Sequence, residues 1–198
     1  MAELDMSFWS GPLLVLWLYL PGYLANTAAM FGGKWLPELL GVEPLPIDGG
    51  RRLSDGHRIL GDGKTWNGLT GALIGGGLLC MFTHWAGRDT IAENGVFLDP
   101  LIWAGPGDWF WVGGEWGAAF IVGFCLGLGC MIGDCTGSFV KRRLGKKREG
   151  SESSQAPLLD TLPFALCSFA MGLLLFPDAL VGNFDLIGAM LALLILTP

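Results

Sequence analysis

Charge is what this sequence has least of. Asp, Glu, Lys and Arg make up only 15% of the 198 residues, whereas hydrophobic residues make up 52%. A soluble domain has about a quarter of its residues charged and a smaller apolar share. The composition therefore excludes an ordinary soluble domain and predicts an integral membrane protein, folded as one compact domain over residues 1–198.

Histidine and paired cysteine motifs are also scarce. His57 and His84 are the two histidines, and neither has a second His or Cys at the spacing of a metal site. The cysteines lie in or beside apolar segments and lack zinc-finger spacing, so we expect them to act as small buried hydrophobic residues. They are Cys80, Cys125, Cys130, Cys135 and Cys167. The sequence predicts no disulfide framework.

Five apolar stretches approach the roughly 20 residues that a membrane-spanning helix needs. We therefore predict an all-α, polytopic membrane protein with five transmembrane helices. The first stretch has Glu3 and Asp5 before it instead of the basic region of a cleavable signal peptide. Pro21 predicts a kink within it, and the third stretch is expected to continue as helix into the charged run that follows. The stretches are 9–31, 67–87, 117–133, 161–176 and 184–198.

The basic residues predict the orientation of these helices. Eleven of the twelve Lys and Arg residues lie in two segments, 32–66 and 141–148, whereas the loop between the second and third stretches has only Arg88. Cytoplasmic loops carry the excess of Lys and Arg. Both basic loops and the C-terminus are thus predicted to be cytoplasmic, with the N-terminus outside. Five tryptophans gather on the outer side as an interfacial belt: Trp85, Trp103, Trp109, Trp111 and Trp116.

Asp134 is an acid at the end of a glycine-rich apolar segment. Acids inside membranes mark functional sites by default. If the helix continues, Asp134, Ser138 and Lys141 share one face, with Arg142 beside them, and this group suits a metal and phosphates. The alternative is a helix end whose cations reach toward an anionic membrane surface. That alternative accounts for the cations at 146–148 but not for Asp134.

Asp160 stands at the entrance to the fourth apolar stretch. It could cap that helix, or it could bind a metal, and the local sequence does not separate the two. Mg²⁺ takes one or two carboxylates together with substrate phosphates and water. Asp134 and Asp160, at neighbouring helix ends on the cytoplasmic side, could supply two.

A glycine-rich turn precedes the second apolar stretch. Gly63, Lys64 and Thr65 match the end of a phosphate-binding loop, but Arg58 stands where that pattern requires glycine. Backbone amides and a lysine at a helix start still make an anion site; the alternative is a polar loop whose glycines form turns. Asn26, inside the first stretch, either packs by a hydrogen bond within the bundle or faces the site.

Taken together, several runs resemble the archaeal CDP-archaeol synthase family, a CTP-dependent cytidylyltransferase family of ether-lipid synthesis. The resemblance spans nearly the whole chain, and the Gly-Asp-Gly-Lys-Thr-Trp and Ser-Phe-Val-Lys-Arg-Arg runs are its most specific parts. Asn67 and Thr161 depart from it, because the family often has Arg and Gln there. The runs are 21–26, 46–48, 55–66, 133–134, 137–145 and 157–160.

The resemblance implies five membrane helices, Mg²⁺ as cofactor and a cytoplasmic active site. The reaction would transfer CMP from CTP to the phosphate of 2,3-bis-O-(geranylgeranyl)-sn-glycerol 1-phosphate and release pyrophosphate, with no nucleic acid involved and no protein partner evident. Asp134, Lys141 and Asp160 would be catalytic, with both carboxylates on the metal. Contacts to CTP and the lipid phosphate would come from Asn26, Gly61, Asp62, Gly63, Lys64, Thr65, Ser138, Arg142 and Arg143.

The chemistry of such a reaction agrees with these residue types. An anionic lipid phosphate must attack the α-phosphorus of another anion, so cations must offset the repulsion. The nucleophile is already ionised, and no general base is needed. A Mg²⁺ or anion transporter with Asp134 in its path is the alternative, but the outer halves of the predicted helices are nearly all apolar.

Overall fold

The computed structural model describes residues 10–89, 96–145, 157–180 and 186–196. Within these ranges the chain is helical, and two isolated bridges, Pro46 with Thr65 and Arg52 with Arg58, stand in place of strands. The predicted all-α class is confirmed at this level. The helices are α1 (Ser10–Leu18), α2 (Leu20–Met30), α3 (Leu36–Leu40), α4 (Trp66–Gly87), α5 (Gly114–Arg143), α6 (Pro157–Leu175), α7 (Pro177–Leu180) and α8 (Leu186–Leu196). A short π-helix, η1 (Phe31–Trp35), joins α2 to α3.

The first helical run is bent by 45° between α1 and the segment that begins with α2. Pro21 lies in the first turn of α2 and cannot donate a backbone hydrogen bond, which explains the predicted kink. The prediction that this helix ends at Phe31 is wrong: it continues through η1 and α3 to Leu40. Gly41 ends it in the left-handed conformation at φ 65°. The polar loop is therefore residues 41–65.

Helices α4 and α5 are the two described helices long and apolar enough to cross a membrane. The bent run from α1 to α3 could form a third crossing, and the apolar part of α6, Leu162–Leu175, is shorter. Helix α5 has 30 residues and runs past Gly133 to Arg143, as predicted. Helix α6 begins at Pro157, four residues before the predicted start.

Glycines allow α5 to pack closely against both neighbouring helices. A Cβ atom added to Gly76 of α4 would lie 2.5 Å from the carbonyl oxygen of Gly123 on α5. On the other side, a Cβ on Gly133 would lie 2.6 Å from the carbonyl carbon of Pro163 on α6. Only hydrogen fits at such distances, and close backbone approach is how helices associate in lipid. These contacts fix the position of Asp134, the next residue of α5.

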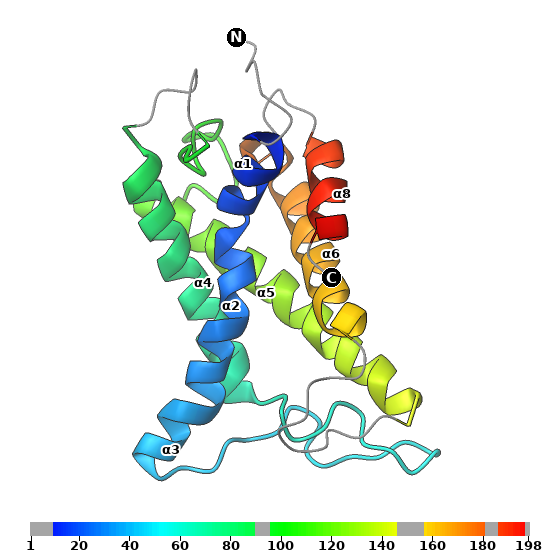
Figure 1. Ribbon diagram of the computed structural model, residues 1–198. Coiled ribbons are helices and arrows are strands. Elements are labelled where there is room, and N and C mark those ends of the chain that lie inside the picture. Colours follow the sequence, from blue (N-terminus) through cyan, green and yellow to red (C-terminus); the bar gives the residue numbers. More distant parts are fainter. Residues whose placement is uncertain (1–9, 90–95, 146–156, 181–185, 197–198) are drawn as a thin grey trace.

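The two ends of the bundle differ. At the bottom of Figure 1, α3 and the end of α5 diverge, and the polar loop passes between them. At the other end the chain is closed by apolar packing, with Leu98 and Phe110 buried and the Trp17 indole donating to the Leu98 carbonyl at 2.8 Å. Trp85 and Trp109 are exposed there, as expected of residues at a membrane interface.

Candidate active site

Lys64 and Asp134 meet across the open end of the bundle. The Lys64 ammonium donates to Asp134 Oδ2, although the two residues are 70 positions apart. Each side chain is only 18% exposed, so the pair is screened less than a surface ion pair. The sequence predicted both residues as site residues from separate motifs, and the structure brings them together.

The last turns of α5 carry the other residues predicted around Asp134. Ser138 is 5% exposed, whereas Lys141 and Arg142 are half-buried. A Cβ on Gly61 would lie 3.2 Å from Arg142 Nε, so this guanidinium lies against the glycine backbone of the polar loop. The end of α5 and the Gly61–Lys64 turn are therefore opposing walls of one site.

The backbone around Lys64 is held by a short antiparallel pairing. Ile47 N donates to the Lys64 carbonyl at 2.8 Å, and Trp66 N donates to the Leu45 carbonyl at 2.9 Å. Lys64 N in turn donates to the Gly61 carbonyl at 3.3 Å. Lys64 thus extends from a braced turn, which suits a side chain that must present its charge at a fixed place.

Asp48 organises the same loop from inside. Its carboxylate accepts bonds from Gly50 N, Leu60 N and Gly61 N, each at 3.0 Å, and from two nitrogens of Arg58 at 2.6 and 3.2 Å. The Arg58 guanidinium, followed by the backbone donors, holds the pKa of Asp48 well below its usual range. The sequence predicts no role for Asp48, because nothing in a loop sequence indicates which acid is buried.

Arg143 joins the loop to the end of α5. Its guanidinium donates to Asp55 Oδ2, to the Arg58 carbonyl at 2.6 Å and to the His57 carbonyl at 3.4 Å, and it lies 5.2 Å from the centre of the Phe139 ring. The backbone N–H of His57 and then Arg143 lower the pKa of Asp55. The predicted phosphate contact of Arg143 stays a prediction, but these bonds already give the side chain a structural partner.

The remaining predicted residues fall in three kinds of place. Thr65 is buried and caps α4, accepting a bond from Gly68 N at 3.0 Å. Asp62 pairs with Arg58 at 2.7 Å but is 84% exposed, next to the exposed Gly63. Asn26 is exposed on α2, and its contact with a substrate stays a prediction.

Asp160 is the fourth residue of α6. It does not precede the helix, so the capping alternative is wrong. Its side chain lies outside the described residues, and its role as a second metal ligand stays a prediction.

Asp134 is the carboxylate between the Lys64 turn and α5 that the sequence predicted as a metal ligand. No group of three His, Cys, Asp or Glu that could hold a metal ion occurs in the described part of the chain. Mg²⁺ does not require such a group, because it binds through one or two carboxylates together with phosphates and water. Asp134, partly exposed and facing the loop, fits that kind of ligand set.

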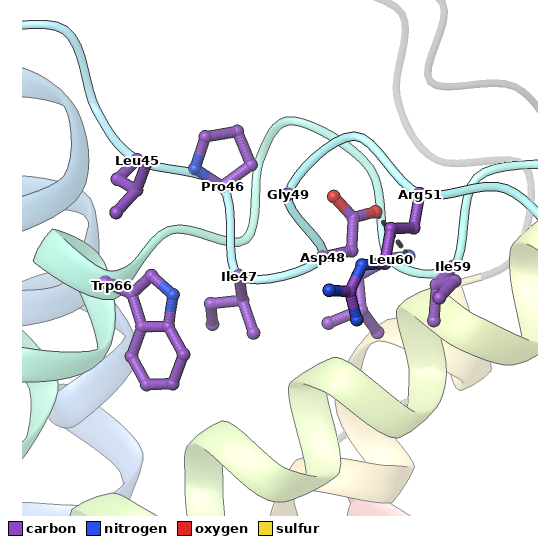
Figure 2. A pocket seen from close by; sticks show the side chains of 9 residues that line it. All are labelled: Leu45, Pro46, Ile47, Asp48, Gly49, Arg51, Ile59, Leu60 and Trp66. Carbon is purple, nitrogen blue, oxygen red and sulfur yellow. Dashed lines mark hydrogen bonds between the residues drawn. The ribbon is translucent and has the colours of Figure 1, made fainter.

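A pocket of about 500 Å³ lies beside the Lys64 turn. Trp66, Ile47 and Ile59 point to the same side of the loop in Figure 2, and they give the pocket a mainly apolar wall, with Arg51 at its edge. This size is typical of small-molecule sites. The sequence does not predict this pocket, because the apolar residues that line it are scattered along an irregular loop.

Comparisons with known proteins agree on one family. The sequence model of a family described as "CarS-like: CDP-archaeol synthase" matches residues 10–102 and 110–197. The chain is 36% identical over 180 residues to a CDP-archaeol synthase of Methanosarcina barkeri, covering 90% of this chain and 88% of the relative. It is 34% identical over 198 residues to a CDP-archaeol synthase of Thermococcus gammatolerans, covering 100% and 88%.

A solved structure is also similar. It is described as "Structural insight into an intramembrane enzyme for archaeal membrane lipids biosynthesis". It matches with a TM-score of 0.59 and 27% identity over 91% of this chain and 88% of the other.

Proposed function

The chain belongs to the CDP-archaeol synthase family, and we propose that it carries out its reaction between the Lys64 turn and the end of α5. It is a membrane-embedded cytidylyltransferase of archaeal lipid synthesis. It transfers CMP from CTP to 2,3-bis-O-(geranylgeranyl)-sn-glycerol 1-phosphate and releases pyrophosphate. The observation that carries the location is the partly buried Lys64–Asp134 ion pair, which joins two motifs of the family pattern.

Lys64 is the cation best placed to contact the triphosphate. Without nucleotide its ammonium is neutralised by Asp134. A triphosphate offers a more highly charged partner, so Lys64 exchanges the carboxylate for phosphate oxygens. Stabilising the charge that develops on pyrophosphate is then electrostatic catalysis by a preorganised cation.

Asp134, with Asp160, would hold the Mg²⁺ that accompanies the nucleotide. When bound, this ion would supply Lewis-acid stabilisation of the phosphoryl oxygens. The fit rests on Asp134 facing the loop with part of its carboxylate exposed. When Lys64 binds the phosphates instead of Asp134, the carboxylate has no cation beside it, and Mg²⁺ would take that place.

The other residues would shape the two anion positions. Lys141 and Arg142, half-buried on the last turns of α5, would bind the attacking lipid phosphate or the nucleotide. Asn26 and Ser138 would supply neutral contacts. The Gly61–Thr65 turn, which includes Asp62, would contribute backbone amides at the start of α4, where anions are favoured, and the contacts of Arg143 would hold the loop against α5.

The membrane arrangement completes the proposal. We expect five crossings that form one catalytic domain in the cell membrane, with the N-terminus outside and both the C-terminus and the site cytoplasmic. The support is the placement of the basic residues of the polar loop and of residues 141–143 at the open end of the bundle, with the exposed Trp85 and Trp109 at the other end. CTP would thus enter from the cytoplasm while the lipid chains stay between helices.

Replacing Asp134 tests the location of the site. Asp134→Asn is expected to abolish pyrophosphate release from CTP in the presence of the lipid phosphate, because the metal ligand is lost. Lys64→Met is expected to lower kcat about 10²–10³-fold, the usual cost of removing one electrostatic stabiliser. The assay is pyrophosphate release by the purified protein in detergent, with thermal unfolding measured in parallel.

Asp108→Asn is the matched control, because Asp108 accepts a backbone bond from Gly105 N at 2.7 Å at the opposite end of the bundle. It should leave turnover unchanged. A folded Asp134→Asn protein with full activity would remove this residue from the site. If the wild-type protein turned over neither CTP nor dCTP with any lipid phosphate, the cytidylyltransferase activity itself would be contradicted.

A further inference from the structure

The most densely bonded side chain described outside the reacting groups is Asp48. Its side chain is 1% exposed, and its two oxygens accept five hydrogen bonds. A carboxylate offers about four lone-pair positions, so Asp48 has no capacity left for a metal or a substrate. Any effect of Asp48 on the reaction must therefore act through the backbone amides and the Arg58 guanidinium that it binds.

Those groups frame Lys64 on both sides. Oδ2 fixes Leu60 N and Gly61 N, and the Gly61 carbonyl accepts from Lys64 N at 3.3 Å. Ile47, which directly precedes Asp48, donates its backbone N–H to the Lys64 carbonyl at 2.8 Å. Asp48 therefore joins the two strands of loop from which the Lys64 side chain extends.

We infer that Asp48 is a positioning residue for CMP transfer, which holds the Gly61–Lys64 turn so that the Lys64 ammonium reaches the site of Asp134. This inference rests on the proposed function of Lys64. The backbone hydrogen bonds of Asp48 hold the turn in position. The Arg58 ion pair, in contrast, neutralises the buried carboxylate and ties it to the exposed Asp62.

Asp48→Asn disturbs both sets of bonds, so its comparison with a variant of Arg58 separates the two contributions. The amide of this variant has one acceptor oxygen and two donor hydrogens. In either orientation the amide nitrogen faces backbone or guanidinium donors that Asp48 now satisfies. The turn must therefore move, although the size of the residue is unchanged.

The experiment compares Asp48→Asn with Arg58→Gln in the full-length protein. Displacing a reacting group by about 1 Å can cost about 10²-fold in rate. Asp48→Asn is therefore expected to lower kcat and kcat/KM for CTP together, by about 10–10²-fold. Arg58→Gln leaves the three backbone donors to Asp48 in place. Because it removes the partner of a buried carboxylate, it is expected to lower the Tm, but its kcat, measured well below that Tm, is expected to stay within about threefold of wild type, as is that of the control Asp108→Asn. Equal losses in Asp48→Asn and Arg58→Gln would overturn the inference.

A second measurement does not need activity. The Lys64 amine is labelled with a water-soluble acylating reagent and quantified by mass spectrometry. The displaced turn in Asp48→Asn should expose the amine and raise its labelling severalfold over wild type and Asp108→Asn. Unchanged labelling would overturn the inference even if the wild-type protein proved inactive, whereas an inactive wild type with raised labelling in Asp48→Asn would contradict only the proposed function. If Asp48→Asn fails to fold, Asp48→Ser, which keeps one acceptor oxygen, replaces it in both measurements.

Discussion

Gly133 is the point at which packing of α5 on α6 and placement of the site coincide, so Gly133→Ala is the sharpest test of the fold. A Cβ there would lie 2.6 Å from the carbonyl carbon of Pro163, and the carbonyl oxygen is nearer still. Ordinary contact begins at 3.4 Å. Both obstructing atoms are backbone, so no side chain can rotate away and the helices must separate by about 0.8 Å or more.

The free-energy cost of this separation follows from overpacking. Inserting a methyl group into a packed interface costs typically about 1–3 kcal/mol. Alanine recovers up to about 1 kcal/mol, because glycine is the poorer helix former. We therefore expect a net loss of about 1–2 kcal/mol in the free energy of unfolding, which appears as a lower Tm in detergent.

Gly133→Ala should also lower kcat under conditions in which the variant is still folded. Asp134 follows Gly133 on α5, and Asp160 precedes Pro163 by one turn on α6, so the same movement separates the two proposed metal ligands. A misplacement near 1 Å can cost about 10²-fold in rate. Pyrophosphate release measured well below the Tm, where the variant is folded, should show a drop in kcat of about 10–10²-fold.

Alanine variants of two further glycines serve as comparisons for Gly133→Ala. A Cβ on Gly129 would lie 2.8 Å from the Cys167 carbonyl oxygen, about 0.6 Å short of ordinary contact, and it is one turn farther from Asp134. Gly129→Ala should therefore lower the Tm with a smaller loss of kcat. Gly107, in the segment between α4 and α5, has no atom within 4 Å of an added Cβ, so Gly107→Ala should change neither. Full activity and an unchanged Tm in Gly133→Ala would refute the reasoning.

The loop supplies two more predictions. Thr65→Ala removes the bond to Gly68 N that caps α4 and should cost about 1 kcal/mol of stability, whereas Thr65→Ser should keep most of it; thermal unfolding of the two variants side by side checks this. Asp48 has a folded-state pKa below its ordinary value of about 3.9, chiefly because of Arg58. Its contribution to stability is therefore fully present above that value and is lost as pH falls through the folded pKa. The difference in Tm between wild type and Asp48→Asn should be constant from about pH 5.5 to 8 and should shrink below about pH 4; a difference that instead grows on acidification would contradict this assignment.

The sequence predicted the long helices because their signal is local. An apolar run of sufficient length forms a helix in a membrane whatever it packs against. The end of the first helix was mispredicted because Gly32, Gly33 and Lys34 have the composition of a loop. In the structure a Cβ on Gly32 would lie 2.9 Å from the Asn67 carbonyl oxygen, so these glycines pack against α4 and the helix persists. That contact joins residues far apart in the sequence, and no local pattern contains it.

The candidate site divides in the same way. Asp134 draws attention in the sequence because it is a charge at the end of an apolar run, and Lys64 because it follows a glycine-rich turn at a helix start. Asp48 does not, since its role depends on three backbone amides and Arg58 converging on it through the fold of the loop. Asn67, set aside because it departs from the family pattern, accepts a bond from Leu45 N at 3.3 Å through its side chain, a structural role that sequence alone does not reveal.

With the roles proposed for Lys64 and Asp134, their ion pair would couple binding of the nucleotide to binding of the metal. Each side chain is only 18% exposed, and removing the partner of a buried charge is costly. A triphosphate that takes Lys64 from Asp134 leaves a carboxylate without a cation in a poorly solvated place. A divalent ion that takes Asp134 alone leaves the ammonium unpaired. Under the proposed roles, each charge would exchange one partner for another only when both bind, so the ion pair would favour the complete Mg²⁺–CTP complex over either component.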